Sequence, residues 1–151
     1  MAWFLDYVGY SCKDSGFIIK EIAIVTLDGE RCYNYFITGP HAYPNNHCQT
    51  INYQYKMHNL RWDFGDYEFD EAMMDIARKL CNDKVYVKGY EKQKLISSLF
   101  PSINCVEIID IPRFNELNNC IHERCEVKHG NHCARRKAYE IRHTYKEKFN
   151  I

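Results

Sequence analysis

The fold class is decided by residues 17–27, which read FIIKEIAIVTL. Apolar side chains, many of them β-branched, dominate this run, which is typical of a strand. The Asp28-Gly29 pair that follows is a strong signal for a tight hairpin turn. Residues 31–38 then predict the returning strand, and the aromatic and β-branched residues 3–10 predict a strand that precedes both. We therefore expect the first third of the chain to form an antiparallel meander of three strands.

Helices alternate with strands in the rest of the chain. Residues 69–80 read FDEAMMDIARKL and carry apolar residues at helical spacing, which predicts a helix with Asp66 as its N-cap. Beyond it, the pattern predicts a strand, a helix, a strand and a final helix: residues 84–88, about 90–100, 105–111 and about 133–148. The order β-β-β-α-β-α-β-α predicts an α/β fold, a mixed five-stranded sheet flanked by helices. Because no repeat or linker interrupts this order, we expect residues 1–151 to form a single domain.

The composition is that of an ordinary globular protein. Hydrophobic residues make up 46% of the chain and charged residues 26%, and 20 basic residues balance 20 acidic ones. The overall charge therefore does not indicate nucleic-acid binding. No apolar run is long enough to span a membrane, and the start of the chain lacks the pattern of a secretory signal. We expect no membrane association and a location in the cytoplasm or the nucleus.

Cysteine and histidine residues cluster towards the end of the sequence. The chain has eight cysteines, and a disulfide framework is not expected without a secretory signal. The stretch CIHERCEVKHGNHC holds three cysteines and three histidines: Cys120, His122, Cys125, His129, His132 and Cys133. Zinc takes thiolate and imidazole ligands at short spacings, although this spacing is not that of a standard zinc finger. The cluster predicts a C-terminal Zn2+ site.

The predicted element order resembles that of the ribonuclease-H-like exonucleases, whose carboxylates hold two metal ions. These enzymes begin with Asp-x-Glu on the first strand; this chain has Asp6, but Val8 occupies the second position. Glu91 is the nearest candidate for the third acid, and Lys137 replaces the last one, in HCARRKA at residues 132–138. We therefore expect no conventional two-metal exonuclease and assign no catalytic residue. In an alternative interpretation, Asp6 is only a polar strand residue near a sheet edge.

The chain resembles the Maelstrom domain over most of its length. The resemblance lies in four residues, within IIKEIAIV, CIHERC and HCARRKAYEI: Glu21, Cys120, His122 and Cys133. It implies a ribonuclease-H-like fold that lacks the exonuclease acids, and Zn2+ held by these four side chains. It also implies binding of single-stranded RNA, with a link to small-RNA (piRNA) silencing of transposons. One residue separates Cys120 from His122 where the family has two, which leaves three rival ligands: Cys125, His129 and His132.

Three functions remain open from the sequence. In the first, the chain is a module that binds single-stranded RNA through basic residues of its last helix: Arg135, Arg136, Lys137 and Arg142. These residues fit a solvated helix face equally well. In the second, which the resemblance suggests, the chain is an unconventional endonuclease for single-stranded RNA. In the third, it is a protein-interaction scaffold in which aromatic residues at positions 53–67, including Trp62, anchor a protein partner.

Overall fold

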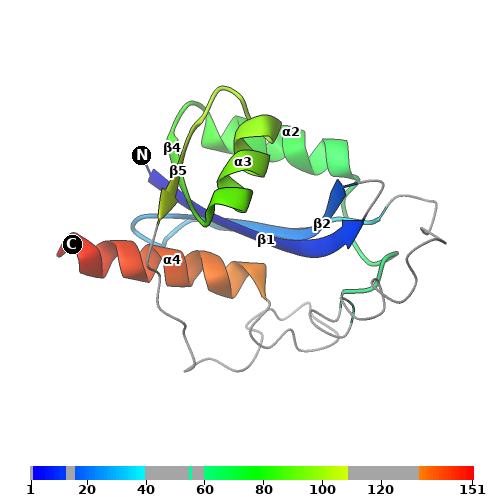
Figure 1. The fold of residues 1–151 in the computed structure, drawn as a ribbon, viewed down its shortest axis with the longest axis horizontal. Coiled ribbons are helices and arrows are strands. Elements are labelled where there is room, and N and C mark those ends of the chain that lie inside the picture. Colours follow the sequence, from blue (N-terminus) through cyan, green and yellow to red (C-terminus); the bar gives the residue numbers. More distant parts are fainter. Residues whose placement is uncertain (1, 13–15, 40–54, 56–59, 109–132) are drawn as a thin grey trace.

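The fold is an α/β arrangement built on one mixed sheet (Figure 1). The computed structural model describes residues 2–12, 16–39, 55, 60–108 and 133–151. Within these residues, five strands form the sheet in the order β3-β2-β1-β4-β5: β1 (Ala2–Cys12), β2 (Gly16–Thr26), β3 (Cys32–Phe36), β4 (Lys84–Lys88) and β5 (Asn104–Ile108). The same residues form three longer helices: α2 (Phe69–Leu80), α3 (Tyr90–Leu99) and α4 (Ala134–Lys148). None of the described helices is long and apolar enough to cross a membrane.

The strand directions give the sheet a ribonuclease-H-like topology. β2 pairs antiparallel with both β1 and β3, whereas β1, β4 and β5 run parallel. The turn after β2 is closed by a hydrogen bond of 2.9 Å from Gly29 N to Thr26 O. Gly29 has a φ of 77°, a conformation that favours glycine. The predicted element order and the predicted α/β fold class are confirmed.

The two faces of the sheet pack against different helices. Figure 1 shows α2 and α3 on one side of the sheet and α4 on the other. Because side chains alternate along a strand, β1 sends Trp3, Leu5 and Tyr7 into the core beneath α2 and α3. Its intervening residues Phe4 and Val8 lie in the core beneath α4. A polar residue on either face of β1 is therefore buried and needs a partner.

The start of α2 differs from the prediction that Asp66 caps it. The helix begins at Phe69 with Glu68 at the N-cap, and no side chain caps it with a hydrogen bond. The cause lies in the chain just before the helix, where Asp66 N and Tyr67 N both donate to Phe36 O, at 2.9 and 3.2 Å. These bonds hold the backbone of Asp66 and Tyr67 against the end of β3. The helix therefore begins only after this segment, at Phe69.

A fully buried lysine ties the sheet to the segment that precedes α2. Lys20 of β2 is 0% exposed. Its Nζ donates to the backbone carbonyls of Ile37, Trp62 and Phe64, at 2.6, 2.7 and 2.6 Å. An ammonium group carries three hydrogens, so these three acceptors satisfy it. The contact fixes a loop that has no regular structure of its own.

Replacing Lys20 with methionine should destabilise the fold. The variant retains a long side chain but leaves buried carbonyl oxygens without their donor, which we expect to lower the free energy of unfolding by about 2 kcal/mol. Urea unfolding followed by circular dichroism measures this change. The exposed residue Lys94 provides a matched control, Lys94→Met, which should have little effect. Equal unfolding free energies for the two variants would contradict the role given to Lys20.

Candidate functional site

Two of the predicted zinc ligands meet where α4 joins the sheet, a place we call the α4 junction. Glu21 lies on β2, Cys133 is the N-cap of α4, and both are 0% exposed. Glu21 Oε1 accepts a hydrogen bond of 3.0 Å from Ala134 N, although these residues are 113 positions apart. Its other oxygen, Oε2, accepts one of 3.0 Å from Asn34 Nδ2. A carboxylate of the sheet thus satisfies a backbone group at the start of α4, where helical partners are lacking.

Burial sets the chemistry of the α4 junction. It raises the pKa of Glu21 to about 7, and the hydrogen bonds from Ala134 and Asn34 oppose this shift. Cys133 Sγ accepts a hydrogen bond of 3.5 Å from Arg136 N. A carboxylate oxygen and a thiolate sulfur are both ordinary ligands of zinc. Glu21 and Cys133 therefore fit as two ligands of a tetrahedral Zn2+ site.

The other predicted ligands lie outside the described residues: Cys120, His122, Cys125, His129 and His132. Within the described ranges, no group of three or more His, Cys, Asp or Glu side chains is placed to hold a metal ion. The structure brings together Glu21 and Cys133, and the identity of the remaining ligands stays a prediction.

The acid of the first strand is paired with a lysine. Asp6 lies on β1, on the face covered by α4, and its side chain is 2% exposed. Lys92, in the first turn of α3, forms an ion pair with Asp6 Oδ1 and donates a hydrogen bond of 3.1 Å to Tyr7 O. The expectation that Asp6 lies near a sheet edge holds only locally. β1 is the central strand, but it stops pairing with β4 at Phe4.

Two further lysines lie near this pair, and we refer to Asp6, Lys88, Lys92 and Lys137 as the lysine cluster. Lys88 ends β4, and Lys137 lies in the first turn of α4. Burial lowers the pKa of Lys137; Asp6 opposes this shift, and the charges of Lys92 and Lys88 add to it. The four side chains are thus close enough to influence one another, although they come from four different elements. Cations outnumber acids in the cluster by three to one.

The other predicted RNA-binding residues are engaged with the protein itself. Arg136 is 1% exposed, and its Nε lies 3.1 Å from Glu140 Oε1. Arg142 Nε donates to Leu27 O at 2.7 Å, which ties α4 to the turn after β2. The side chain of Arg135 is partly buried. Of the four basic residues predicted on this helix, Lys137 is the one that belongs to the lysine cluster.

Sequence reasoning missed Lys88 and Lys92. Both lie in KGYEK, residues 88–92, directly after the buried strand β4. Their position was the available signal, because open α/β sheets bind ligands beyond the carboxyl ends of their parallel strands. Glu91, the candidate for the third acid, lies in the same segment and is exposed.

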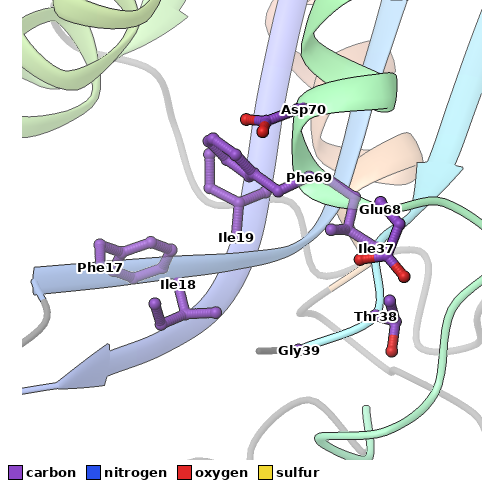
Figure 2. Close-up of a pocket in the computed structure, with 9 residues that line it drawn as sticks. All are labelled: Phe17, Ile18, Ile19, Ile37, Thr38, Gly39, Glu68, Phe69 and Asp70. Carbon is purple, nitrogen blue, oxygen red and sulfur yellow. The ribbon is translucent and has the colours of Figure 1, made fainter. Parts of the chain in front are cut away.

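A pocket of about 480 Å³ opens elsewhere, at the start of α2. Figure 2 shows Phe17, Ile18 and Ile19 on β2 along one part of its lining, and Phe69 and Asp70 on α2 along another. Its volume is in the usual range for small-molecule sites. Among the described residues, neither Glu21, Cys133 nor the predicted RNA-binding residues of α4 line this pocket, so it is separate from the α4 junction and the lysine cluster.

Comparison with known proteins assigns no family. The sequence matches no protein-family model and no curated protein. The functional interpretation therefore depends on the sheet topology, the α4 junction and the lysine cluster.

The pairing of Asp6 with Lys92 should be measurable as a coupling free energy. Asp6→Ala leaves an ammonium group without its acid, and Lys92→Met leaves a buried carboxylate without its cation, so the two losses should not add. We expect a coupling of about 1–2 kcal/mol from a double-mutant cycle measured by urea unfolding. The exposed pair Arg61 and Asp63 provides the control cycle, which should show no measurable coupling. Additive losses at Asp6 and Lys92 would show that the ion pair does not stabilise the fold.

Proposed function

We propose that this chain is a ribonuclease-H-like module that binds single-stranded RNA, is stabilised by Zn2+ at the α4 junction, and does not act as a two-metal exonuclease. The observation that carries the proposal is the ion pair between Asp6 and Lys92. It means that the acid retained on the first strand is already neutralised by an ammonium group. The resemblance to the Maelstrom domain supplies the class of RNA and the link to small-RNA silencing of transposons.

Several features of the sheet argue against two-metal hydrolysis. That mechanism needs clustered carboxylates to hold two ions against one phosphate. Val8, the next residue on the same face as Asp6, is apolar and 8% exposed. A divalent ion beside Asp6 would have to displace Lys92, and it would meet the like charge of Lys137. The lysine cluster therefore favours an anion over Mg2+.

Zinc suits the α4 junction because Glu21 and Cys133 are both buried there, and Glu21 bonds to Ala134 N, the backbone group next to Cys133. In this proposal, residues of the segment 120–133 complete the ligand set. The bound ion would act as a structural cross-link between β2 and the start of α4. Its contribution to RNA binding is indirect, since α4 carries Lys137 towards Asp6.

The alternative functions have less support. An endonuclease needs a group that activates a nucleophile. Of the buried acids in the described ranges, Asp6 is held by Lys92 and Glu21 by the start of α4. Trp62, the predicted anchor for a protein partner, packs against the ring of Tyr10 with 5.3 Å between ring centres. RNA binding without cleavage is therefore the function that these contacts support best.

Purified protein should bind single-stranded RNA and leave it intact. We expect the affinity for a labelled RNA of mixed sequence to fall as salt rises, because phosphate contacts release counterions. Fluorescence anisotropy measures binding, and denaturing gels measure integrity in Mg2+ and in chelator. Double-stranded RNA of the same sequence is the control ligand. Absence of binding at low salt would remove the RNA-binding function. Shortening of the RNA that needs both Mg2+ and Asp6 would show that exonuclease chemistry survives.

The purified protein should also contain one zinc ion per chain. Glu21→Gln and Cys133→Ser each remove a ligand, so both variants should lose most of the metal. A chelator should lower the Tm of the wild-type protein. Elemental mass spectrometry measures zinc content, and Cys81→Ser, at an exposed cysteine, is the matched control that should keep it. The zinc site would be excluded if the wild-type protein contained no metal and the chelator did not change its Tm.

A further inference from the structure

The lysine cluster lies where the sheet opens. β1 stops pairing with β4 at Phe4 and Tyr86. If the pairing continued for two more residues in the same register, Asp6 would lie opposite Lys88. β4 continues to pair with β5 through Lys88, so β1 and β4 separate at this point. The carboxyl ends of separating parallel strands are where open α/β sheets receive ligands.

Positive charge exceeds negative charge at this opening. The charged groups that act on Lys137 or Glu140 include four cations and two acids: Lys88, Lys92, Arg136, Lys137, Asp6 and Glu140. Two ion pairs engage both acids, one between Lys92 and Asp6 and one between Arg136 and Glu140. Lys88 and Lys137 form no ion pair with any residue in the described ranges. Two ammonium charges therefore remain in a chain whose formal net charge is zero.

One acceptor at the opening is also unused. Asp6 Oδ1 is engaged by Lys92, but Asp6 Oδ2 is buried and has no hydrogen-bond partner within the described part of the chain. A buried carboxylate oxygen without a donor is costly, so a ligand that supplies one is favoured. The opening thus offers cations for an anionic group and, beside them, an acceptor for a hydroxyl.

We propose that the lysine cluster binds one ribose-phosphate unit of RNA. Lys88 and Lys137 hold the phosphate, and Asp6 Oδ2 accepts a hydrogen bond from a ribose hydroxyl. This inference rests on the proposed RNA-binding function and assigns it a place in the fold. The 2′-hydroxyl is the group that lets a protein distinguish RNA from DNA, so the site also gives the module a preference for RNA.

The chemistry of an ammonium group accounts for binding without cleavage. In two-metal nucleases the ions both hold the phosphate oxygens and activate the attacking water. Lysine holds a phosphate as a point charge and donates hydrogen bonds to it. It is not a Lewis acid and does not lower the pKa of a bound water in the way that a metal ion does. A site built from lysines therefore holds a phosphate but lacks the groups that would hydrolyse it.

Loss of both phosphate-binding lysines should weaken RNA binding. For Lys88→Gln/Lys137→Gln we expect affinity for single-stranded RNA to fall by about tenfold or more, as for lost hydrogen bonds to a charged group. The slope of log Kd against log salt should fall by about 1. The control double variant is Lys94→Gln/Lys148→Gln, at two exposed lysines. Lys137→Arg keeps the charge and should stay within about threefold of the wild-type affinity.

Two results of this comparison would overturn the site. If wild-type protein binds RNA and the Lys88 and Lys137 variant behaves like its control, the RNA-binding function stands and the assignment of the lysine cluster is wrong. The assignment of the lysine cluster is also wrong if Lys137→Arg loses as much affinity as Lys88→Gln/Lys137→Gln.

RNAs with a 5′-hydroxyl and with a 5′-phosphate show whether the bound phosphate is internal or terminal. If Lys88→Gln/Lys137→Gln loses the same affinity for both RNAs, the site binds an internal phosphodiester. If it loses affinity only for the RNA with a 5′-phosphate, the site binds a terminal phosphate.

The contact of Asp6 with a ribose hydroxyl has its own readout. Wild-type protein should bind RNA more tightly than DNA of the same sequence. Asp6→Ala removes the acceptor but frees the charge of Lys92, so affinity for DNA should be kept or raised while the preference for RNA is lost. A merely structural role for Asp6 would weaken binding of both nucleic acids alike. An unchanged ratio of the two affinities would overturn this contact.

Inorganic phosphate tests the site without RNA. In a phosphate titration followed by NMR of 15N-labelled lysine side chains, the signals of Lys88 and Lys137 should move and saturate, and that of Lys94 should not. Unmoved signals would overturn the phosphate site whatever the RNA result. Saturable shifts in a protein that binds no RNA would keep the phosphate site and reject the proposed function.

Discussion

The burial of Asp6 is the constraint on which this face of the molecule depends. A carboxylate enclosed between a sheet and a helix is tolerated only with a positive partner, because removing an unpaired charge from water is costly. In the ribonuclease-H-like exonucleases the partner is a metal ion, whereas here it is Lys92 from α3. The ammonium group of Lys92 therefore compensates the charge of Asp6 without a metal ion. Because Lys92 already pairs with Asp6, Lys137 adds further positive charge beside this pair.

The second buried acid determines how α4 docks. On the face under α4, β2 is otherwise apolar, with Ala23 and Val25 in the core, so a carboxylate at Glu21 needs an explanation. The bond from Ala134 N supplies one, because the start of a buried helix has N–H groups without helical partners. The same bond places the carboxylate at Ala134, the residue that follows Cys133 in the chain. In the proposed zinc site, Glu21 Oε1 keeps its bond to Ala134 N, and the ion binds Oε2 beside or in place of Asn34 Nδ2.

Sequence periodicity predicted the strands and helices because each of them buries one face. The cap at Asp66 was predicted wrongly, since hydrogen bonds to Phe36 O, a tertiary contact, override a local preference. Lys92 and Asp6 are 86 positions apart, so only the strand order brings them together, and no local pattern reveals the pair. Lys137 was found because it occupies a position in a motif. Contacts that depend on topology are thus the part of the site that sequence reasoning misses.

One helix serves both halves of the proposed site. Lys137 N donates to Cys133 O at 3.0 Å, so the cap of α4 and the lysine are one helical turn apart and share a face. Whatever holds the start of α4 against β2 therefore sets how Lys137 sits beside Asp6. In the proposed function, zinc can influence RNA binding through this turn without contacting RNA. The proposed zinc site and the proposed phosphate site would then be linked through one turn of α4. In this proposal, a bound Zn2+ would position the helix that carries Lys137.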